Sequence, residues 1–219
     1  MKLPDRPRFL YLTGCDGTGK TTQADLLCAH LKQIGIQPRR VWLRFPFLLS
    51  VPLLVYARWR RLSWHEVIEG ARHGYWDFRA SPLLKRLLPW TLLLDAGLAA
   101  FIRIYLPLWR GETVVCERFV LDMLVDLMAA CDDLGLTRRP PGTFYLRLIP
   151  KEAVMAVLDL EADTIRARRV DLRSDRRLEL RLKLFRQLAA DLSLPLISSA
   201  ASAAEVNRNL MRQFRTPHA

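Results

Sequence analysis

Short apolar runs alternate with longer amphipathic segments along most of this 219-residue chain. Five runs have the length and the β-branched or aromatic content of buried strands, and they cover residues 9–13, 40–44, 113–116, 154–160 and 194–198. Amphipathic stretches with helical spacing lie between them, over residues 21–34, 120–134, 178–192 and 202–214. Because strands that alternate with helices form parallel sheets, the pattern predicts an α/β fold whose ligands bind at the carboxyl ends of the strands.

Residues 45–110 interrupt this alternation and contain the most apolar part of the chain. An apolar stretch over 45–57 is broken by two prolines, and the segment 58–80 is rich in tryptophan, tyrosine, histidine and arginine. We expect residues 58–80 to form helical segments that cover the substrate site, and residues 83–109 to form one long helix. Further along, a Pro-Pro-Gly run makes residues 138–142 a predicted loop.

The long helix at 83–109 has three interpretations. Asp95 is the only ionisable residue between Arg86 and Arg103, so the composition approaches that of a membrane span. However, a proline and a glycine interrupt the run, and a carboxylate near mid-bilayer costs about 2.5–3.5 kcal/mol. We expect a buried helix, at the interface of a homodimer; contact with a membrane surface and a true membrane span stay open.

The amino-acid composition gives the chain a strong positive net charge. Hydrophobic residues make up 51% of the chain, which excludes disorder, and the length suits one domain with a full core. The formal net charge is +12, and 28 of the 34 basic residues are arginines, whose planar fork matches phosphate and carboxylate groups. Because these arginines are spread along the chain without an aromatic platform for single strands, we expect polyphosphate ligands or an anionic lipid surface rather than nucleic acid.

The cysteines and the beginning of the sequence indicate a reducing compartment. None of the four cysteines is spaced as C-x-x-C and no histidine pair lies near them, so neither a zinc site nor a disulfide framework is expected. The first residues contain no apolar core of a signal peptide. We therefore expect a cytoplasmic protein, with association to a membrane as an open addition.

The motif that carries the chemistry is a G-x-x-x-x-G-K-T loop directly after the first predicted strand. Its glycines let backbone N–H groups turn inward around an anion. Lys20 is expected between the β- and γ-phosphates of ATP, and the Thr21 hydroxyl is a ligand for Mg²⁺. The helix that starts near Lys20 directs its positive end at the same phosphates. We therefore predict ATP and Mg²⁺ as cofactors, bound by Gly14, Cys15, Asp16, Gly17, Thr18, Gly19, Lys20, Thr21 and Thr22.

Charged residues follow two other predicted strands. Arg44 ends the second strand, and Glu117 and Arg118 follow the third. Because the carboxyl ends of parallel strands meet at one edge, we expect Arg44 and Arg118 to converge on an acceptor phosphate and Glu117 to hold Mg²⁺ through water. Asp16 in the loop is a candidate ligand for an acceptor hydroxyl. A surface ion pair between Glu117 and Arg118, and a solvated Arg44, are the structural alternatives.

In their order along the chain, five features resemble the nucleoside monophosphate kinases, and thymidylate kinases in particular. They are the loop over 14–23, Arg44-Phe45-Pro46, Glu117-Arg118-Phe119, Leu158-Asp159-Leu160 ahead of an arginine-rich segment, and Ala204-Glu205-Val206 in the last helix. The resemblance spans nearly the whole chain. It implies one P-loop kinase domain over 1–219, an α/β three-layer sandwich with a five-stranded parallel sheet in the order 2-3-1-4-5. It also implies an apolar helical insertion at about 45–110 and an arginine-rich lid at about 161–178.

The same resemblance implies a reaction and assigns roles. The reaction is ATP-dependent phosphoryl transfer to a nucleoside monophosphate, which for a thymidylate kinase converts dTMP and ATP to dTDP and ADP. Because Gly17 puts no side chain into the loop, the lid supplies the arginine that stabilises the transferring group. The catalytic candidates are therefore Lys20, Glu117, Arg118, Arg166, Arg169 and Arg173. Substrate binding is assigned to Asp16, Arg44, Arg118 and Asp122, which lies one turn before Asp126.

Departures from the family pattern keep two other hypotheses open. The family's Asp-Arg-Tyr is Glu117-Arg118-Phe119 here, its second phosphate-binding arginine falls near Leu48, and its base-recognition residues fall within 93–98. A kinase that phosphorylates a hydroxyl, on a deoxynucleoside or an amphiphilic alcohol, is the second hypothesis. Such enzymes carry a carboxylate base where this chain has Arg44-Phe45-Pro46. A non-catalytic nucleotide-binding module at a membrane surface or in an assembly is the third.

Overall fold

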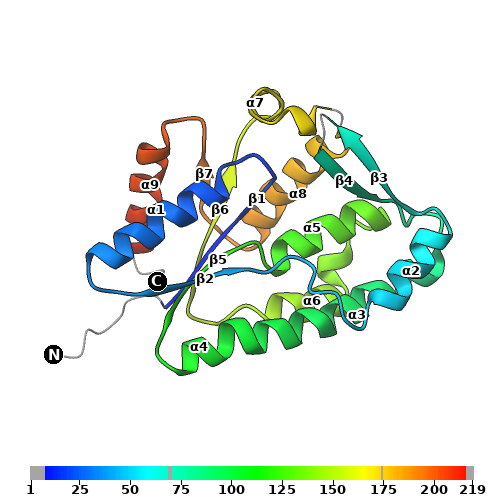
Figure 1. Ribbon diagram of the computed structural model, residues 1–219, viewed down its shortest axis with the longest axis horizontal. Coiled ribbons are helices and arrows are strands. Elements are labelled where there is room, and N and C mark those ends of the chain that lie inside the picture. The colour runs from blue at the N-terminus through cyan, green and yellow to red at the C-terminus, as the bar shows by residue number, and fades with distance from the viewer. Residues whose placement is uncertain (1–7, 69–70, 174, 216–219) are drawn as a thin grey trace.

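A five-stranded parallel sheet forms the centre of the computed structural model, which describes residues 8–68, 71–173 and 175–215 (Figure 1). The strands are β1 (Phe9–Gly14), β2 (Pro38–Trp42), β5 (Thr113–Glu117), β6 (Ala153–Asp159) and β7 (Leu196–Ser198). They lie in the order β2-β5-β1-β6-β7, and every neighbouring pair is parallel. Counted within this sheet in chain order, the arrangement is 2-3-1-4-5, as the sequence predicts.

Alternate side chains of β1 enter two separate cores, so the molecule has three layers. Leu10 and Leu12 pack on one face, which is covered by α1 (Lys20–Gln33) and α9 (Ala203–Arg215). Phe9 and Tyr11 face the larger core. The helices that cover it are α3 (Pro82–Ala100), α5 (Val120–Cys131), α6 (Pro140–Arg147) and α8 (Leu178–Asp191). The strand that leads into the loop is therefore buried along its whole length.

The segment 58–80 contains a β-hairpin, so the prediction of helical segments there is wrong. It follows α2 (Val51–Trp59), and its strands β3 (Ser63–Ile68) and β4 (Ala71–Trp76) pair antiparallel in a sheet of their own. Trp64 lies opposite Tyr75, and the two rings stack with their centroids 5.9 Å apart. Such cross-strand aromatic pairs stabilise a ladder through contacts that neither strand reveals by itself.

Residues 83–109 lie in one continuous run of helix, as the sequence predicts. α3 leads through a π-helical turn (Phe101–Tyr105) into α4 (Leu106–Trp109). By length and composition the run is able to cross a membrane. In this fold, however, its inner side belongs to the large core, with complete burial of Leu84, Leu88, Leu92, Ala96, Ala100 and Ile104.

Asp95, the one carboxylate of this helix, fixes the start of α2. Its carboxylate accepts hydrogen bonds from the N–H groups of Leu48 (3.0 Å), Leu49 (2.7 Å) and Ser50 (3.0 Å) and from the Ser50 hydroxyl (2.6 Å). Burial opposes ionisation, but these hydrogen bonds lower the pKa of Asp95. The charge that interrupts the apolar sequence is thus satisfied by otherwise unpaired donors at a helix start.

Two prolines begin a helix where the sequence predicts a loop. Pro140 and Pro141 occupy the first positions of α6, where a missing N–H leaves no hydrogen bond unmade. The predicted loop over 138–142 is therefore wrong beyond Arg139. The arginine-rich segment forms α7 (Ala162–Arg168) and a 3₁₀ turn (Val170–Leu172), and Figure 1 shows α7 at the opposite side of the molecule from α3 and α4.

Candidate functional site

The loop after β1 requires its glycines. Gly14, Gly17 and Gly19 have φ angles of +137°, +86° and +87°, which disfavour residues with a side chain. A Cβ on Gly14 would lie 2.3 Å from the carbonyl oxygen of Leu158 on β6. The spacing of the motif therefore follows from the backbone path of a strand that turns sharply into a helix.

Lys20 begins α1 and turns back into the loop. Its Nζ donates to the carbonyl oxygens of Gly14 (2.5 Å) and Cys15 (2.7 Å) and lies 3.8 Å from Oδ1 of Asp16. Burial lowers the pKa of Lys20, and the Asp16 carboxylate opposes that shift. The next residue, Thr21, is exposed at the start of the helix. The loop is thus formed around the ammonium group, and the hydroxyl predicted to bind metal lies at the surface.

Four charged side chains meet beside the loop, where β2 and β5 end. Arg44 donates to Asp126 through Nε (3.1 Å) and Nη2 (2.6 Å), and to Asp16 through Nη1 (3.2 Å). Arg118 pairs with the other oxygen of Asp16. Arg118 also has φ +64°, a strained backbone conformation of the kind found at functional sites. The structure therefore brings together the predicted Asp16, Arg44 and Arg118, and it adds Asp126.

These groups stabilise one another's charges. Burial alone would raise the pKa of Asp16, but Lys20, Arg44 and Arg118 hold it well below its usual range. Burial alone would lower the pKa of Arg44, but Asp126 and Asp16 raise it. The carboxylate of Asp16 and the guanidinium of Arg44 are therefore both ionised at neutral pH.

Arg181 and Asp175 extend the network, and the sequence interpretation missed both. Arg181 on α8 donates through Nη1 to Asp175 (2.5 Å), and its Nε lies 3.3 Å from Oδ1 of Asp126. Burial would lower the pKa of Arg181, but Asp126 and Asp175 raise it. The available signal was an arginine next to Leu182 in the apolar stripe of a helix, a place where a charge needs a buried partner.

The space between these side chains is nearly filled. A cavity of about 10 Å³, which is room for roughly one water molecule, is lined by Gly14, Cys15, Asp122, Phe185 and the side chains of the network other than Asp175. The arginines are thus held by carboxylates in the space where an acceptor was expected. A ligand that used these guanidinium groups would first have to displace their carboxylate partners.

Asp122 binds β1, the strand that leads into the loop. Its Oδ2 accepts hydrogen bonds from the hydroxyls of Tyr11 (3.0 Å) and Thr13 (2.8 Å) on β1 and from the Phe119 N–H (3.2 Å). Burial raises the pKa of Asp122. Its Oδ1 is buried without a hydrogen-bond partner among the described residues. Substrate binding by Asp122 stays a prediction; its visible contacts position β1.

Glu117 carries a free carboxylate oxygen at the end of β5. Its Oε1 accepts from Nη2 of Arg40 (2.8 Å), whose guanidinium also pairs with Asp25 on α1. Its Oε2 is buried and has no hydrogen-bond partner within the described part of the chain. Buried acceptors need partners, and carboxylate, hydroxyl and water oxygens are the ligands of Mg²⁺. The free oxygen of Glu117 therefore suits the predicted metal, while Arg40 holds the other oxygen; metal binding by Thr21 stays a prediction.

The lid lies against Gly17. A Cβ built on Gly17 would be 2.9 Å from Cγ2 of Ile165, which is buried in α7, and 3.4 Å from Cγ of Arg169. The guanidinium of Arg169 pairs with Asp171 through Nε (2.8 Å) and Nη2 (2.7 Å). Among the three lid candidates, the structure thus puts the stem of Arg169 in contact range of the loop.

The other two lid candidates have different partners. Arg166 donates to Glu179 on α8 (2.8 Å) and lies 3.4 Å from Asp163, and Arg173 donates to the Arg166 carbonyl (3.3 Å). The Arg166–Glu179 contact joins α7 to α8, and these partners of both guanidinium groups lie outside the loop. Their catalytic role stays a prediction.

An aromatic group that the sequence interpretation missed lies beside Arg44. Phe45 stacks on Phe47 (5.7 Å between centroids) and contacts Trp76 of the hairpin (4.7 Å), and the Cζ atom of Arg44 lies 5.8 Å from the Phe45 ring. Arg177, near the end of the lid segment, donates to the Trp76 carbonyl (2.6 Å). The hairpin thus brings an aromatic side chain to the strand end that carries Arg44.

Comparison with known proteins places these features in a family context. No family model matches the chain. Thymidylate kinases of two Anaplasma marginale strains, Florida and St. Maries, are each 30% identical to it over 112 residues, which are 51% of this chain and 45% of each relative. The chain thus spans less than half the length of the curated relatives it matches. This similarity agrees with the resemblance drawn from the motifs.

A solved structure extends the likeness to the whole fold. The thymidylate kinase from Ehrlichia chaffeensis superimposes with a TM-score of 0.56, covering 93% of this chain and 96% of that one at 16% sequence identity. At 16% sequence identity, this match shows a shared fold and nothing more. The chain has the α/β fold of a thymidylate kinase, as the sequence predicts.

Proposed function

We propose that this protein transfers the γ-phosphoryl group of ATP to a nucleoside monophosphate or a similar small phosphate, in the cytoplasm. The observation that carries the proposal is the meeting of Arg44 and Arg118, from adjacent strand ends, on the loop residue Asp16. Two guanidinium groups at the edge of a phosphate loop form an anion site next to the donor site. The sequence similarity to thymidylate kinases supports the same class of reaction.

On the donor side, the loop N–H groups and Lys20 bind the phosphates of ATP. The ammonium group now bonded to two carbonyl oxygens gains a stronger, charged acceptor when a phosphate enters. Thr21 and Glu117 are the residues that would hold Mg²⁺, which neutralises charge on the phosphates when bound. The start of α1 adds its positive end to the same site.

On the acceptor side, binding is an exchange of partners. Asp16 and Asp126 keep Arg44 and Arg118 charged and oriented while no acceptor is present. An incoming phosphate dianion replaces carboxylate oxygens with its own and leaves no arginine unpaired. Asp126 keeps Arg181 as a neighbour during this exchange. The reaction then needs mainly positioning and charge stabilisation, which these groups and the lid provide.

Arg169 is the lid residue proposed to act on the transferring group. Its stem lies over Gly17, and its guanidinium pairs with Asp171, a carboxylate two residues away, which a rotation of the side chain releases. An arginine finger of this kind is worth roughly 10³–10⁵ in rate in related phosphoryl transfers.

We propose dTMP as the acceptor to examine first. The relatives at 30% identity are thymidylate kinases, and the aromatic group of Phe45, Phe47 and Trp76 offers a ring surface for a base beside Arg44. This surface replaces the helix positions near 93–98, where Leu93 is buried in the core and Leu94 faces outward.

A hydroxyl acceptor is the second candidate, because the structure brings the carboxylates of Asp16 and Asp126 to the acceptor side. Asp16 is poorly suited as a general base, since its pKa lies well below its usual range. A phosphate acceptor is already nucleophilic and needs no base, so the charges favour the first candidate.

Release of ADP from MgATP, followed with a coupled assay, tests the proposal on matched pairs of acceptors such as dTMP with thymidine. We expect ADP release with the monophosphate, none with the nucleoside, and loss of both binding and turnover of ATP in Lys20→Ala. Turnover with thymidine alone would establish the hydroxyl-acceptor kinase. Tight ATP binding without any acceptor-dependent release would leave the non-catalytic nucleotide-binding module.

A further inference from the structure

Asp126 is bonded to one arginine and lies beside a second. Its Oδ2 accepts both hydrogen bonds from Arg44 (3.1 and 2.6 Å), and its Oδ1 lies 3.3 Å from Nε of Arg181. The contact with Arg181 is an ion pair without a hydrogen bond, because this Nε is buried and has no hydrogen-bond partner among the described residues. One N–H donor beside the Asp126 carboxylate is therefore unused while Arg44 is bound to it.

Arg181 is held in place by a residue other than Asp126. Its Nη1 donates to Oδ2 of the buried Asp175 (2.5 Å), and Oδ1 of Asp175 accepts a hydrogen bond from the N–H of Arg177 (2.9 Å), directly before α8 begins. The positive end of α8 favours a carboxylate at this place. The Arg181 guanidinium is thus anchored on α8 whether or not Asp126 is bonded to Arg44.

The exchange of partners proposed above requires Arg44 to leave Asp126, and the present inference rests on that proposed function. The Asp126 side chain is only 12% exposed, and a carboxylate that loses its cation in such a place is left as an uncompensated charge. Within the described part of the chain, the cations paired with Asp126 are Arg44 and Arg181. The unused N–H of Arg181 is therefore the donor that can compensate Asp126 when Arg44 turns away.

We propose that Arg181 is a positioning residue for acceptor binding, which takes over Asp126 when Arg44 turns to the acceptor phosphate. Arg181 does not contact the acceptor; it makes the ion pair between Arg44 and Asp126 reversible. Without Arg181, an acceptor that binds Arg44 leaves Asp126 without a cation. That cost is the same in the bound complex and in the transition state, so it raises the acceptor KM and leaves kcat nearly unchanged.

The test is steady-state kinetics of Arg181→Met at saturating MgATP. The acceptors are dTMP, dCMP, dAMP and dGMP, and the one that the wild type uses fastest is varied. We expect the acceptor KM to rise roughly tenfold or more, with kcat and the KM for ATP within about threefold of the wild type. Arg181→Lys keeps a positive charge beside Asp126 and should restore part of the acceptor affinity.

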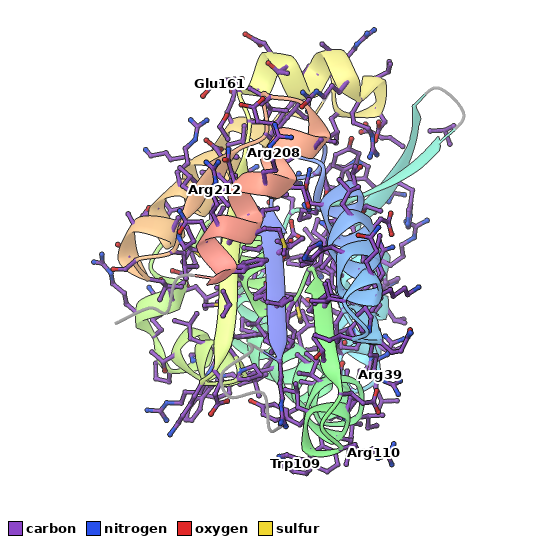
Figure 2. All side chains as sticks on the ribbon, turned by 90° about the vertical axis from the view of Figure 1, so that its left-hand side faces the viewer. Arg39, Trp109, Arg110, Glu161, Arg208 and Arg212 are labelled. Carbon is purple, nitrogen blue, oxygen red and sulfur yellow. The ribbon has the colours of Figure 1, made fainter. Side chains whose placement is uncertain are left out.

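Arg186→Met is the matched control. Arg186 lies on the same helix and also pairs with two carboxylates, those of Asp159 (2.9 Å) and of Glu161 (2.7 Å), which Figure 2 shows at the outer edge of the molecule. This variant also loses an arginine with two acidic partners, but neither partner belongs to the network around Arg44. Its acceptor KM should equal that of the wild type.

A second substitution separates positioning from direct contact with the acceptor. Asp126→Asn removes the charge that Arg181 is proposed to take over, so in this background no carboxylate is left uncompensated. Adding Arg181→Met to Asp126→Asn should therefore change the acceptor KM by no more than about twofold. A rise of roughly tenfold in both backgrounds would mean that Arg181 binds the acceptor itself, and it would overturn the proposal.

The unfolding temperature of each variant shows whether it folds. If Arg181→Met does not, Arg181→Lys gives the same comparison in the wild-type and Asp126→Asn backgrounds, with a smaller rise in KM expected in the first and none in the second. An unchanged acceptor KM in folded Arg181→Met would overturn the inference and leave the proposed function intact. A wild type that phosphorylates none of the monophosphates would overturn the proposed function, and this inference with it.

Discussion

Arg118 is the residue on which the proposed acceptor site depends most. Its backbone is strained at φ +64°, and its guanidinium reaches the same carboxylate that Arg44 reaches from the neighbouring strand. A lysine at this place would keep the charge, but it would lose the planar fork that makes paired bonds to phosphate oxygens. The substitution Arg118→Lys therefore tests whether the acceptor site needs only a positive charge or also the planar geometry of the guanidinium group.

We predict that Arg118→Lys raises the acceptor KM and lowers kcat, for a loss of roughly 10- to 100-fold in kcat/KM, the range expected when a charge-assisted hydrogen bond is lost. The KM for ATP should change little. Arg39→Lys is the control, because Arg39 pairs with Glu112 on the surface. Steady-state kinetics with each substrate varied in turn would show the effect, and a loss confined to ATP would move Arg118 to the donor side.

Single residues were predictable from sequence where the backbone itself dictates them. The loop residues and the arginines at strand ends follow from a motif and from the rule that strand ends share an edge. Asp175 and Arg181 belong to no motif and follow no strand. Their importance shows only in their ion pairs, Arg181 with Asp175 and Arg181 with Asp126 on another helix, and these pairs form only in the folded protein. Asp95 was visible as a lone charge, but its role as the cap of α2 depends on a contact across more than forty residues.

At the scale of elements, the contact between the lid and the loop depends on a missing side chain. Gly17 lets α7 approach so closely that a Cβ would be 2.9 Å from Ile165. Gly35 after α1 has a similar φ angle of +80° with nothing within 4 Å of a built Cβ. The two glycines therefore share a left-handed backbone conformation and differ in what an added side chain would touch.

We predict that Gly17→Ala and Gly35→Ala each lower the free energy of unfolding by about 1 kcal/mol, because alanine tolerates positive φ poorly. Only Gly17→Ala should also displace the lid and reduce kcat, by roughly tenfold or more, since misplaced catalytic groups are costly. Chemical denaturation and turnover measured on both variants test this. Equal kcat values in the two would mean that the observed lid position is not used in the reaction.

The start of α2 gives a prediction about pH. Because the pKa of Asp95 is lowered in the folded protein, its ionised form stabilises the fold above the unfolded-state pKa of about 3.9, and that contribution is lost as the pH falls below it. Asp95→Asn should lower the free energy of unfolding at pH 7 by about 1–3 kcal/mol. It should also reduce the loss of stability between neutral and acidic pH.

Denaturation curves across that pH range, beside Asp163→Asn, check this account of the cap. Asp163 is a fitting control because its side chain is 98% exposed. If Asp95→Asn were as stable as the control at pH 7, the four hydrogen bonds to Asp95 would contribute nothing to the fold.

Elements were predictable where one segment contains its own signal. The five sheet strands, the long helix and the α8 and α9 helices follow from periodicity within single segments. The hairpin did not, because Trp64 and Tyr75 stabilise it across two strands. The start of α6 was missed because prolines that usually mark loops also fit the first turn of a helix.

At the scale of the whole molecule, the proposed phosphate site and the exposed apolar side chains of α3 and α4 lie on opposite sides. The loop, the arginine–aspartate network and the lid gather at the carboxyl edge of the sheet, whereas α4 ends at the opposite side (Figure 1). The net charge of +12 favours the approach of nucleotide phosphates to this site. The strand order itself was predictable only through the family resemblance, because pairing between distant strands leaves no local pattern.

The central claim is that the acceptor is itself a phosphate, and identification of the product tests it most directly. Phosphorus NMR of a reaction with MgATP and dTMP should show the coupled pair of resonances of a nucleoside diphosphate other than ADP, formed in equal amount with ADP. Arg118→Lys should form the same product more slowly. The appearance of dTMP from thymidine, or of ADP and inorganic phosphate without any new diphosphate, would contradict the account.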